Sequence, residues 1–241
     1  MNVAMILAGG VGARVGAATP KQFIEVQGKP ILIHTLEIFQ ADPQIDAIEL
    51  VCIQSHMDVI WAMVRQYGIT KVRWICVGGA TYQDSVLNGL HNLEPHCKDD
   101  DIVLIHFGVS PFVDAEIIDD SIAVCREHGN AISSNPCVLC MCQKDPENPS
   151  RSKTGLDRET LMGLNSPQTF RMDYLRELYA EGIEKDVMDD LVDPHTTTLM
   201  LALGRTLYFS KSSQANIKIT TREDIELFEG FLLARRLRQQ R

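Results

Sequence analysis

Short apolar runs alternate along the chain with segments of helical periodicity. Four runs rich in Val, Ile and Leu are bounded by polar residues or glycine, as the buried strands of a parallel sheet are. Three segments carry apolar residues at spacings of three and four, as helices with one buried face do. This alternation predicts an α/β fold with a mostly parallel central sheet, helices on both faces and the four strands near the sheet centre. The predicted strands are residues 3–7, 48–52, 72–77 and 102–105, and the predicted helices are residues 31–39, 57–67 and 81–93.

A polar segment from Gln143 to Asp157 interrupts this pattern, because prolines and a glycine lie there among charged and small residues. We expect one domain over residues 1–241, with a projecting β-arm at about residues 143–161. Arms of this kind can cross into a second subunit. A final helix is predicted from Thr221, and its basic end at residues 235–238 is interpreted as a solvated helix terminus stabilised by the helix dipole.

Composition and charge narrow the possible partners. The chain has 241 residues, of which 45% are hydrophobic, and its 23 basic and 32 acidic residues give a net charge of −9. This charge opposes non-specific binding to nucleic acid or to a membrane surface, so neither is expected as a partner. The first apolar run is too short to span a bilayer and has no basic leader, and the seven cysteines lack framework spacing. We therefore expect a cytoplasmic protein with free thiols.

Three cysteines lie close together in Cys137-Val138-Leu139-Cys140-Met141-Cys142 and are candidate metal ligands. A two-residue gap can place two thiolates on one ion, but no second Cys or His pair follows at ligand spacing. We expect no metal there and interpret the segment as a buried apolar strand.

A glycine-rich loop follows the first predicted strand, with the sequence Ala8-Gly9-Gly10-Val11-Gly12-Ala13-Arg14, and leads to Pro20-Lys21-Gln22. Glycines at the end of a strand let backbone N–H groups face an anion, and Arg14 and Lys21 add positive charge, which suits a triphosphate. The spacing differs both from a Walker loop and from the G-x-G-x-x-G pattern of dinucleotide sites. Taken alone, the motif could also be a glycine turn without a ligand.

Further motifs follow this loop in a specific order. They are Leu7-Ala8-Gly9-Gly10, Pro20-Lys21-Gln22-Phe23, Pro30-Ile31-Leu32-Ile33-His34-Thr35, Gly78-Gly79-Ala80-Thr81, Asp84-Ser85-Val86, Ser166-Pro167-Gln168-Thr169-Phe170 and Asn216-Ile217-Lys218-Ile219-Thr220-Thr221. In these motifs the chain resembles, over nearly its whole length, the cytidylyltransferases that load CMP onto methylerythritol phosphate or ribitol 5-phosphate. The segment through Thr35 and Phe39 looks closer to the ribitol branch.

The resemblance implies a Rossmann-like nucleotidyltransferase fold and transfer of CMP from CTP to a polyol phosphate, with release of pyrophosphate. It also implies a homodimer and a requirement for Mg²⁺, which in this chain we expect to be carried mainly by the triphosphate. Arg14, Lys21 and Lys218 match the cations that stabilise the pentacovalent transition state and the departing pyrophosphate. Arg158 matches a ligand of the acceptor phosphate that reaches across the dimer. The implied nucleotide-binding residues are Ala8, Gly9, Gly10, Val11, Gly12, Gly79, Ala80 and Ser85.

Departures from the family pattern cluster around the metal and the acceptor. The family has His-Asp after the fourth strand, and this aspartate holds magnesium, whereas the chain has His106-Phe107. Phe107 cannot ligate a hard cation, so no protein metal ligand is predicted. Tyr82 stands where a basic residue is common, and Met188 where a threonine precedes an acidic pair. The nucleotide side is therefore preserved better than the acceptor side.

Three hypotheses follow from the sequence. The first is an active cytidylyltransferase with a modified acceptor pocket. The second is a nucleotide-binding homologue that has lost efficient turnover and acts as a sensor or assembly partner, because a fold does not guarantee a function. The third is a nucleotidyltransferase with a different acceptor or base, because backbone contacts to a base cannot be read from side chains.

Overall fold

The computed structural model describes residues 1–10, 20–189, 191, 193 and 195–239. A seven-stranded sheet forms its centre, in the order β11-β7-β10-β6-β1-β4-β5. Strand β1 pairs in parallel with β4 and β6, and β5 and β11 extend the sheet in parallel, whereas β10 is antiparallel to both of its neighbours. The strands are β1 (Asn2–Leu7), β4 (Ala47–Cys52), β5 (Val72–Val77), β6 (Ile102–Phe107), β7 (Asn130–Pro136), β10 (Met162–Arg171) and β11 (Phe209–Lys211).

Helices cover both faces of the sheet, as predicted. Along β1, the side chains of Ala4 and Ile6 pack into one core and those of Val3 and Met5 into the other. This alternation follows from the two-residue period of a strand. The first core is closed by α1 (Ile31–Ala41), α2 (Met57–Gln66) and α4 (Ala115–His128), and the second by α3 (Tyr82–Leu93), α5 (Met172–Glu184) and α6 (Thr196–Ala202). The predicted α/β class is confirmed.

Two details of the sequence prediction were wrong. The strand at residues 72–77 forms, but β5 lies at the edge of the sheet, where Arg73 and Val77 are exposed. An apolar run indicates burial of side chains but does not say how many neighbours the strand has. The segment from Cys137 to Cys142 is not a buried strand, because Cys140 and Cys142 are exposed.

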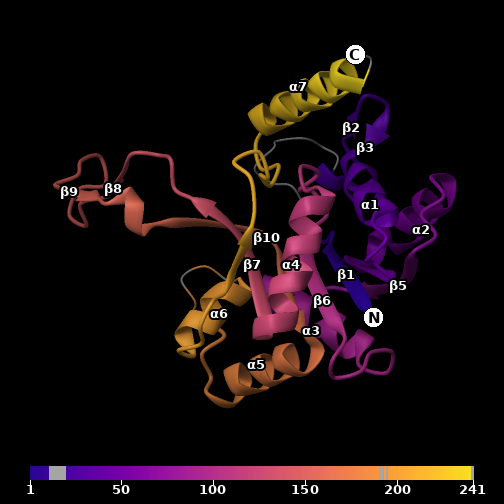
Figure 1. Cartoon of the computed structure of the whole chain (residues 1–241), viewed down its shortest axis with the longest axis horizontal. Helices are drawn as coiled ribbons and strands as arrows, with labels where there is room; N and C mark the ends of the chain where they lie inside the picture. Colours follow the sequence, from indigo (N-terminus) through magenta and orange to yellow (C-terminus); the bar gives the residue numbers. More distant parts are fainter. Residues whose placement is uncertain (11–19, 190, 192, 194, 240–241) are drawn as a thin grey trace.

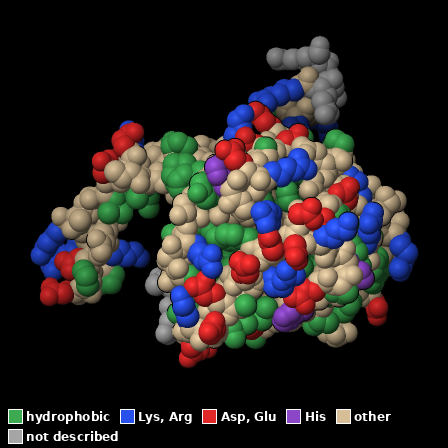
Figure 2. Space-filling view, turned by 60° about the horizontal axis from the view of Figure 1, so that its bottom comes forward, with side chains coloured by type: hydrophobic (Ala, Val, Ile, Leu, Met, Phe, Trp, Pro, Cys, Tyr) green, Lys and Arg blue, Asp and Glu red, His purple; other side chains and the backbone are tan. Residues whose placement is uncertain are grey.

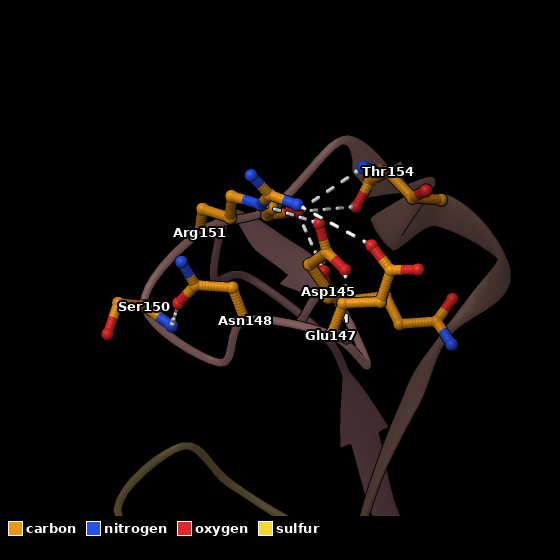
Figure 3. Close-up of polar contacts among 8 residues, drawn as sticks. Asp145, Glu147, Asn148, Ser150, Arg151 and Thr154 are labelled. Carbon is orange, nitrogen blue, oxygen red and sulfur yellow. Dashed lines mark hydrogen bonds and ion pairs between the residues drawn. The ribbon is translucent and has the colours of Figure 1, made fainter.

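A hairpin arm stands away from the body of the molecule (Figure 1). Strands β7 and β10 lead into it, and it contains β8 (Met141–Gln143), paired antiparallel with β9 (Thr154–Leu156), and the short helix η4 (Arg158–Thr160). At its tip, Asp145 accepts a hydrogen bond from Arg151 Nε at 2.7 Å, while Glu147 lies within 3.8 Å of the same guanidinium (Figure 3). The tip is therefore held by its own polar contacts.

A third apolar cluster joins the C-terminal helix α7 (Arg222–Gln239) to the small hairpin of β2 (Glu25–Val26) and β3 (Lys29–Pro30). Thr221 precedes this helix, and Asp224 in its first turn accepts hydrogen bonds at Oδ2 from the backbone N–H groups of Thr220 and Thr221 at 2.7 and 2.8 Å. Phe228 then packs edge-on against Phe112, with ring centroids 5.2 Å apart. Within the described chain, no helix is long and apolar enough to cross a membrane.

Candidate functional site

A cavity of about 510 Å³ opens where several parallel strands end. Its walls come from the carboxyl ends of β1, β4, β5 and β6, from the turn η2 (Lys21–Phe23), and from the segment before α7. In open α/β sheets, ligands bind at this edge, because the loops that follow the strands converge there. The described lining residues are Leu7, Ala8, Gly9, Gly10, Lys21, Gln22, Val51, Ile53, Gly78, Gly79, Ala80, Thr81, Tyr82, Ser85, Phe107, Val109 and Lys218.

Hydrogen bonds fix both ends of the first loop. The backbone N–H of Ala8 donates to the carbonyl of Val51 at 2.7 Å, which continues the pairing of β1 with β4. The buried side chain of Gln22 donates to the carbonyl of Ala8 at 3.0 Å. Lys21 is buried as well, and its Nζ donates to the carbonyl of Ile219 at 3.0 Å. These contacts join the start of the glycine loop, the turn that follows it and the segment that carries Lys218.

The second glycine loop is fitted tightly to the start of α3. Thr81 and Asp84 form a reciprocal capping box, with hydrogen bonds of 3.0 and 3.1 Å between each side chain and the other residue's backbone N–H. Ser85 donates its hydroxyl to the carbonyl of Thr81 at 2.8 Å and accepts from the N–H of Gly79 at 3.1 Å. A Cβ on Gly79 would lie 2.0 Å from Cβ of Asp84, so only glycine fits there without a shift.

Phe107 and Lys218 meet at the cavity wall. Lys218 Nζ lies 3.5 Å from the centroid of the Phe107 ring, within the range in which an ammonium is attracted to an aromatic face. The segment carrying the lysine is anchored on both sides. Asn216 Nδ2 donates to the carbonyl of Ser166 at 2.8 Å, and the N–H of Ile219 donates to the carbonyl of Val109 at 2.9 Å.

Neutral polar and aromatic groups extend the wall beyond Phe107. The ring of Tyr82 lies 6.0 Å from that of Phe107 and 5.0 Å from that of His195. Its hydroxyl is 3.2 Å from Oγ1 of Thr196, and burial raises the pKa of Tyr82 to about 12, so the phenol keeps its proton at neutral pH. Tyr179 also contacts this threonine hydroxyl, at 3.1 Å. Tyr82 therefore contributes an uncharged hydroxyl group at this side of the cavity.

His106, next to Phe107, faces the core and not the cavity. The ring is fully buried, its Nε2 donates to the carbonyl of Ser110 at 3.0 Å, and burial lowers the pKa of His106 to about 4. The imidazole is therefore neutral and structural at physiological pH.

The structure brings eight of the predicted site residues to this one cavity. They are Ala8, Gly9, Gly10, Lys21, Gly79, Ala80, Ser85 and Lys218. Val11, Gly12 and Arg14 lie outside the described residues. Arg158 does not line the cavity in this chain. It lies on η4 of the arm with its side chain 55% exposed, and its Nε is 3.5 Å from a carboxylate oxygen of Glu159.

Sequence reasoning missed three residues that shape the cavity. Gln22 belongs to a motif quoted above, but no contact to the carbonyl of Ala8 was anticipated. Tyr82 and Phe107 were noted as departures from the family pattern, that is, as losses. The aromatic character of Tyr82 and Phe107 was the sequence signal that they could shape the cavity, but only the fold shows that Phe107 contacts Lys218.

The residues present do not fit a protein-bound divalent cation. Among the described lining residues there is no aspartate or glutamate, and Phe107 has no ligating atom. The described part of the chain also contains no group of three His, Cys, Asp or Glu side chains that could hold a metal. Magnesium prefers carboxylate, phosphate or water oxygens, and here the protein supplies no carboxylate from the described cavity wall.

Comparison with known proteins assigns this arrangement to a family. Residues 2–234 match the family model of IspD, 2-C-methyl-D-erythritol 4-phosphate cytidylyltransferase. The chain belongs to this family. Both branches of the cytidylyltransferases are represented among its relatives. A ribitol-5-phosphate cytidylyltransferase of Lacticaseibacillus paracasei is 41% identical, over 98% of this chain and 100% of the relative. A 2-C-methyl-D-erythritol 4-phosphate cytidylyltransferase of Syntrophus aciditrophicus is 36% identical, over 95% of each chain.

A solved structure of the cytidylyltransferase family has the same architecture. The 4-diphosphocytidyl-2C-methyl-D-erythritol synthase of Anaerococcus prevotii superposes with a TM-score of 0.80 at 26% identity, covering 97% of this chain and 96% of the other. The expected Rossmann-like nucleotidyltransferase fold is confirmed. The family membership also confirms the resemblance inferred from the sequence motifs and places the chain among nucleotidyltransferases.

Proposed function

We propose that the protein transfers CMP from CTP to a sugar-alcohol phosphate of the ribitol 5-phosphate or methylerythritol 4-phosphate type. A phosphate oxygen of the acceptor attacks the α-phosphorus of CTP. The bond from this phosphorus to the oxygen of the β-phosphate breaks, and pyrophosphate leaves. The acceptor phosphate is already ionised at neutral pH, so the reaction needs neither a protein nucleophile nor much proton transfer. Catalysis depends on positioning two anions and stabilising the charge that develops.

One observation carries this proposal: two glycine-containing loops and two lysines from distant parts of the chain surround a single cavity at the carboxyl ends of parallel strands. We assign the triphosphate to the backbone of Ala8–Gly12 and the cytidine to Gly79, Ala80 and Ser85. Lys21 and Lys218, together with Arg14, would stabilise the transition state and the leaving pyrophosphate. Exposed backbone N–H groups and fixed ammonium groups are suited to a polyanion in a chain of net charge −9.

The acceptor site is proposed to require a second copy of the chain. Arg158, the expected ligand of the acceptor phosphate, lies on the arm and does not line the cavity of its own chain. The arm exposes apolar side chains, with Val138 58% and Leu139 67% accessible, and Figure 2 shows such side chains among charged ones along it. Exposed apolar surface of this kind favours burial in an interface. We therefore propose a homodimer in which each arm reaches the cavity of the partner.

Two further proposals concern the magnesium ion and the cellular location. Magnesium is expected to arrive with the triphosphate, because Mg²⁺ keeps several waters and the described cavity wall supplies no carboxylate. A cytoplasmic location is supported by the seven cysteines, all of which are free thiols in the structure.

Pyrophosphate release tests the transfer reaction. The protein is incubated with Mg²⁺, one of the four nucleoside triphosphates, and ribitol 5-phosphate or methylerythritol 4-phosphate. We expect release with CTP and loss of at least about a hundredfold in kcat/KM in Lys21→Ala, the scale seen when one charge-stabilising group is removed. The matched control is Lys185→Ala, which removes an exposed lysine that directly follows α5 and should leave the rate unchanged.

The outcomes separate the three hypotheses. CTP binding without pyrophosphate release above the Lys21→Ala background would identify a nucleotide-binding homologue without turnover. Release with another triphosphate in preference to CTP would change the assigned base. Mixing inactive Arg158→Ala and Lys21→Ala chains tests the dimer, since a heterodimer retains one cavity with its own lysine and an intact partner arm. No recovery of activity after chain exchange would contradict a crossing arm.

A further inference from the structure

The cavity presents a ring where a metal ligand was expected, and this ring has a defined position. Phe107 is the last residue of β6, where pairing with β1 fixes its backbone next to Leu7. The rings of Tyr82 and His195 pack against it at centroid distances of 6.0 and 5.8 Å. The phenyl group therefore packs against two neighbouring rings, which also contact each other.

An ammonium group takes the position above this ring. Lys218 Nζ is 3.5 Å from the ring centroid, a direct contact with the aromatic face. Both residues line the cavity, so the charge lies at its wall. The ring attracts the cation through its quadrupole and carries no charge of its own, whereas a carboxylate at the same position would be negatively charged.

The charge on the described cavity wall comes from two lysines. The described wall contains Lys21 and Lys218 and no acidic side chain. A triphosphate bound against the described wall therefore meets two lysines and no carboxylate.

A carboxylate at position 107 would have two opposite effects on a nucleotide. It would attract the divalent cation of a metal–nucleotide complex, and it would repel the bare triphosphate through the low-dielectric cavity. Phe107 has neither effect. We propose that Phe107, by holding Lys218 in place of a metal-binding carboxylate, lets this site bind CTP without a divalent cation. The inference rests on the proposed function, since it specifies the metal state of the nucleotide that the same cavity accepts.

Calorimetric titration of the full chain with CTP, in Mg²⁺ or in EDTA at matched ionic strength, tests this proposal. We expect the Kd in EDTA to lie within about threefold of the Kd in Mg²⁺, because the protein ligand that makes binding metal-dependent is missing. In Phe107→Asp the ratio should exceed about tenfold, because the new carboxylate repels bare CTP and pairs with Lys218.

Phe107→Leu is the matched control, because it removes the ring but adds no charge. Its ratio of the two Kd values should stay as in the parent protein, while both values rise by about threefold to tenfold when Lys218 loses the aromatic face. Circular dichroism and thermal melts show whether each variant folds. The comparison of EDTA with Mg²⁺ on the parent chain needs no variant at all.

The possible results are distinct. A loss of more than about tenfold in EDTA for the parent chain would overturn the proposal and leave the proposed transferase function intact. If the Kd for CTP in EDTA stays close to the Kd in Mg²⁺ in both the parent chain and Phe107→Asp, residue 107 does not determine the metal dependence, and the proposed role of Phe107 is overturned. No CTP binding in either condition would overturn the proposed function, and this inference with it.

Discussion

The buried carboxyl group of Glu49 allows a quantitative prediction about stability. It lies in the middle of β4, whose residues are all buried, and its side chain is fully inaccessible to solvent. Asn92 donates to its Oε1 at 2.8 Å, while Oε2 is buried with no hydrogen-bond partner among the described residues. Burial raises the pKa of Glu49 from 4.5 to about 8. The perturbation proposed is Glu49→Gln, which keeps the shape and removes the titration.

The sign and size of the effect follow from this pKa. Between about pH 4.5 and pH 8 the folded state holds a proton that the unfolded state has lost, so the stability contributed by Glu49 decreases as the pH rises. Each pKa unit corresponds to about 1.4 kcal/mol, so the free energy of unfolding should fall by about 3 kcal/mol between pH 5 and pH 8 because of this residue. Glu49→Gln should abolish this fall.

Urea unfolding of both proteins across this pH range measures the effect. The informative quantity is the difference in free energy of unfolding between variant and parent, because other titrating groups cancel in it. The difference should move in favour of Glu49→Gln by about 3 kcal/mol as the pH rises. Glu226→Gln, at an exposed position of α7, serves as the control and should show no such trend. A change below about 1 kcal/mol for Glu49→Gln would refute the argument that this carboxyl is buried as a neutral acid.

Two further predictions concern a histidine and a glycine. Burial lowers the pKa of His106 from 6.5 to about 4. Between these two pH values the unfolded state binds a proton that the folded state does not bind, so the stability contributed by the neutral His106 is lost as the pH falls. The advantage of the parent over His106→Gln, measured by urea unfolding, should shrink by about 2 kcal/mol from pH 7 to pH 5, and an unchanged advantage would contradict it. Gly79→Ala places a Cβ 2.0 Å from that of Asp84, so we expect a loss of about 1–3 kcal/mol in stability together with weaker CTP binding in a titration. Gly155→Ala on the arm, where a Cβ meets no described atom within 4 Å, is the control, and equal effects of the two substitutions would refute the close-approach argument.

Much of the site could be anticipated because its chemistry is local. Glycines after a strand and a lysine a few residues later indicate a phosphate loop whatever surrounds them, and Gly9, Gly10 and Lys21 do line the cavity. The capping box of Thr81 and Asp84 is also local, because it joins side chains and backbone N–H groups three residues apart. Such features depend on the local backbone conformation and on contacts between residues that are close in the sequence, so the neighbouring residue types are enough to predict them.

Other features depend on contacts between distant segments. The substitution of Phe107 was visible as a missing ligand, but its meeting with Lys218 joins residues more than a hundred positions apart. The same holds for the hydrogen bond from Lys21 to the carbonyl of Ile219. The apolar run of residues 72–77 also did not show that β5 lies at the sheet edge. A strand can be apolar because helices cover its side chains, and this pattern looks the same in the sequence whether the strand has one neighbouring strand or two.

The sequence by itself determined the α/β class, the position of the glycine-rich loop and the membership in the cytidylyltransferase family, because periodicity and short motifs are properties of neighbouring residues. The tertiary structure decided how the cavity is charged and where the arm lies. It placed Lys218 on the face of Phe107, kept acidic side chains off the described wall, and left Arg158 away from the cavity of its own chain. These outcomes depend on the order of strands in the sheet and on long-range packing, which no local pattern specifies.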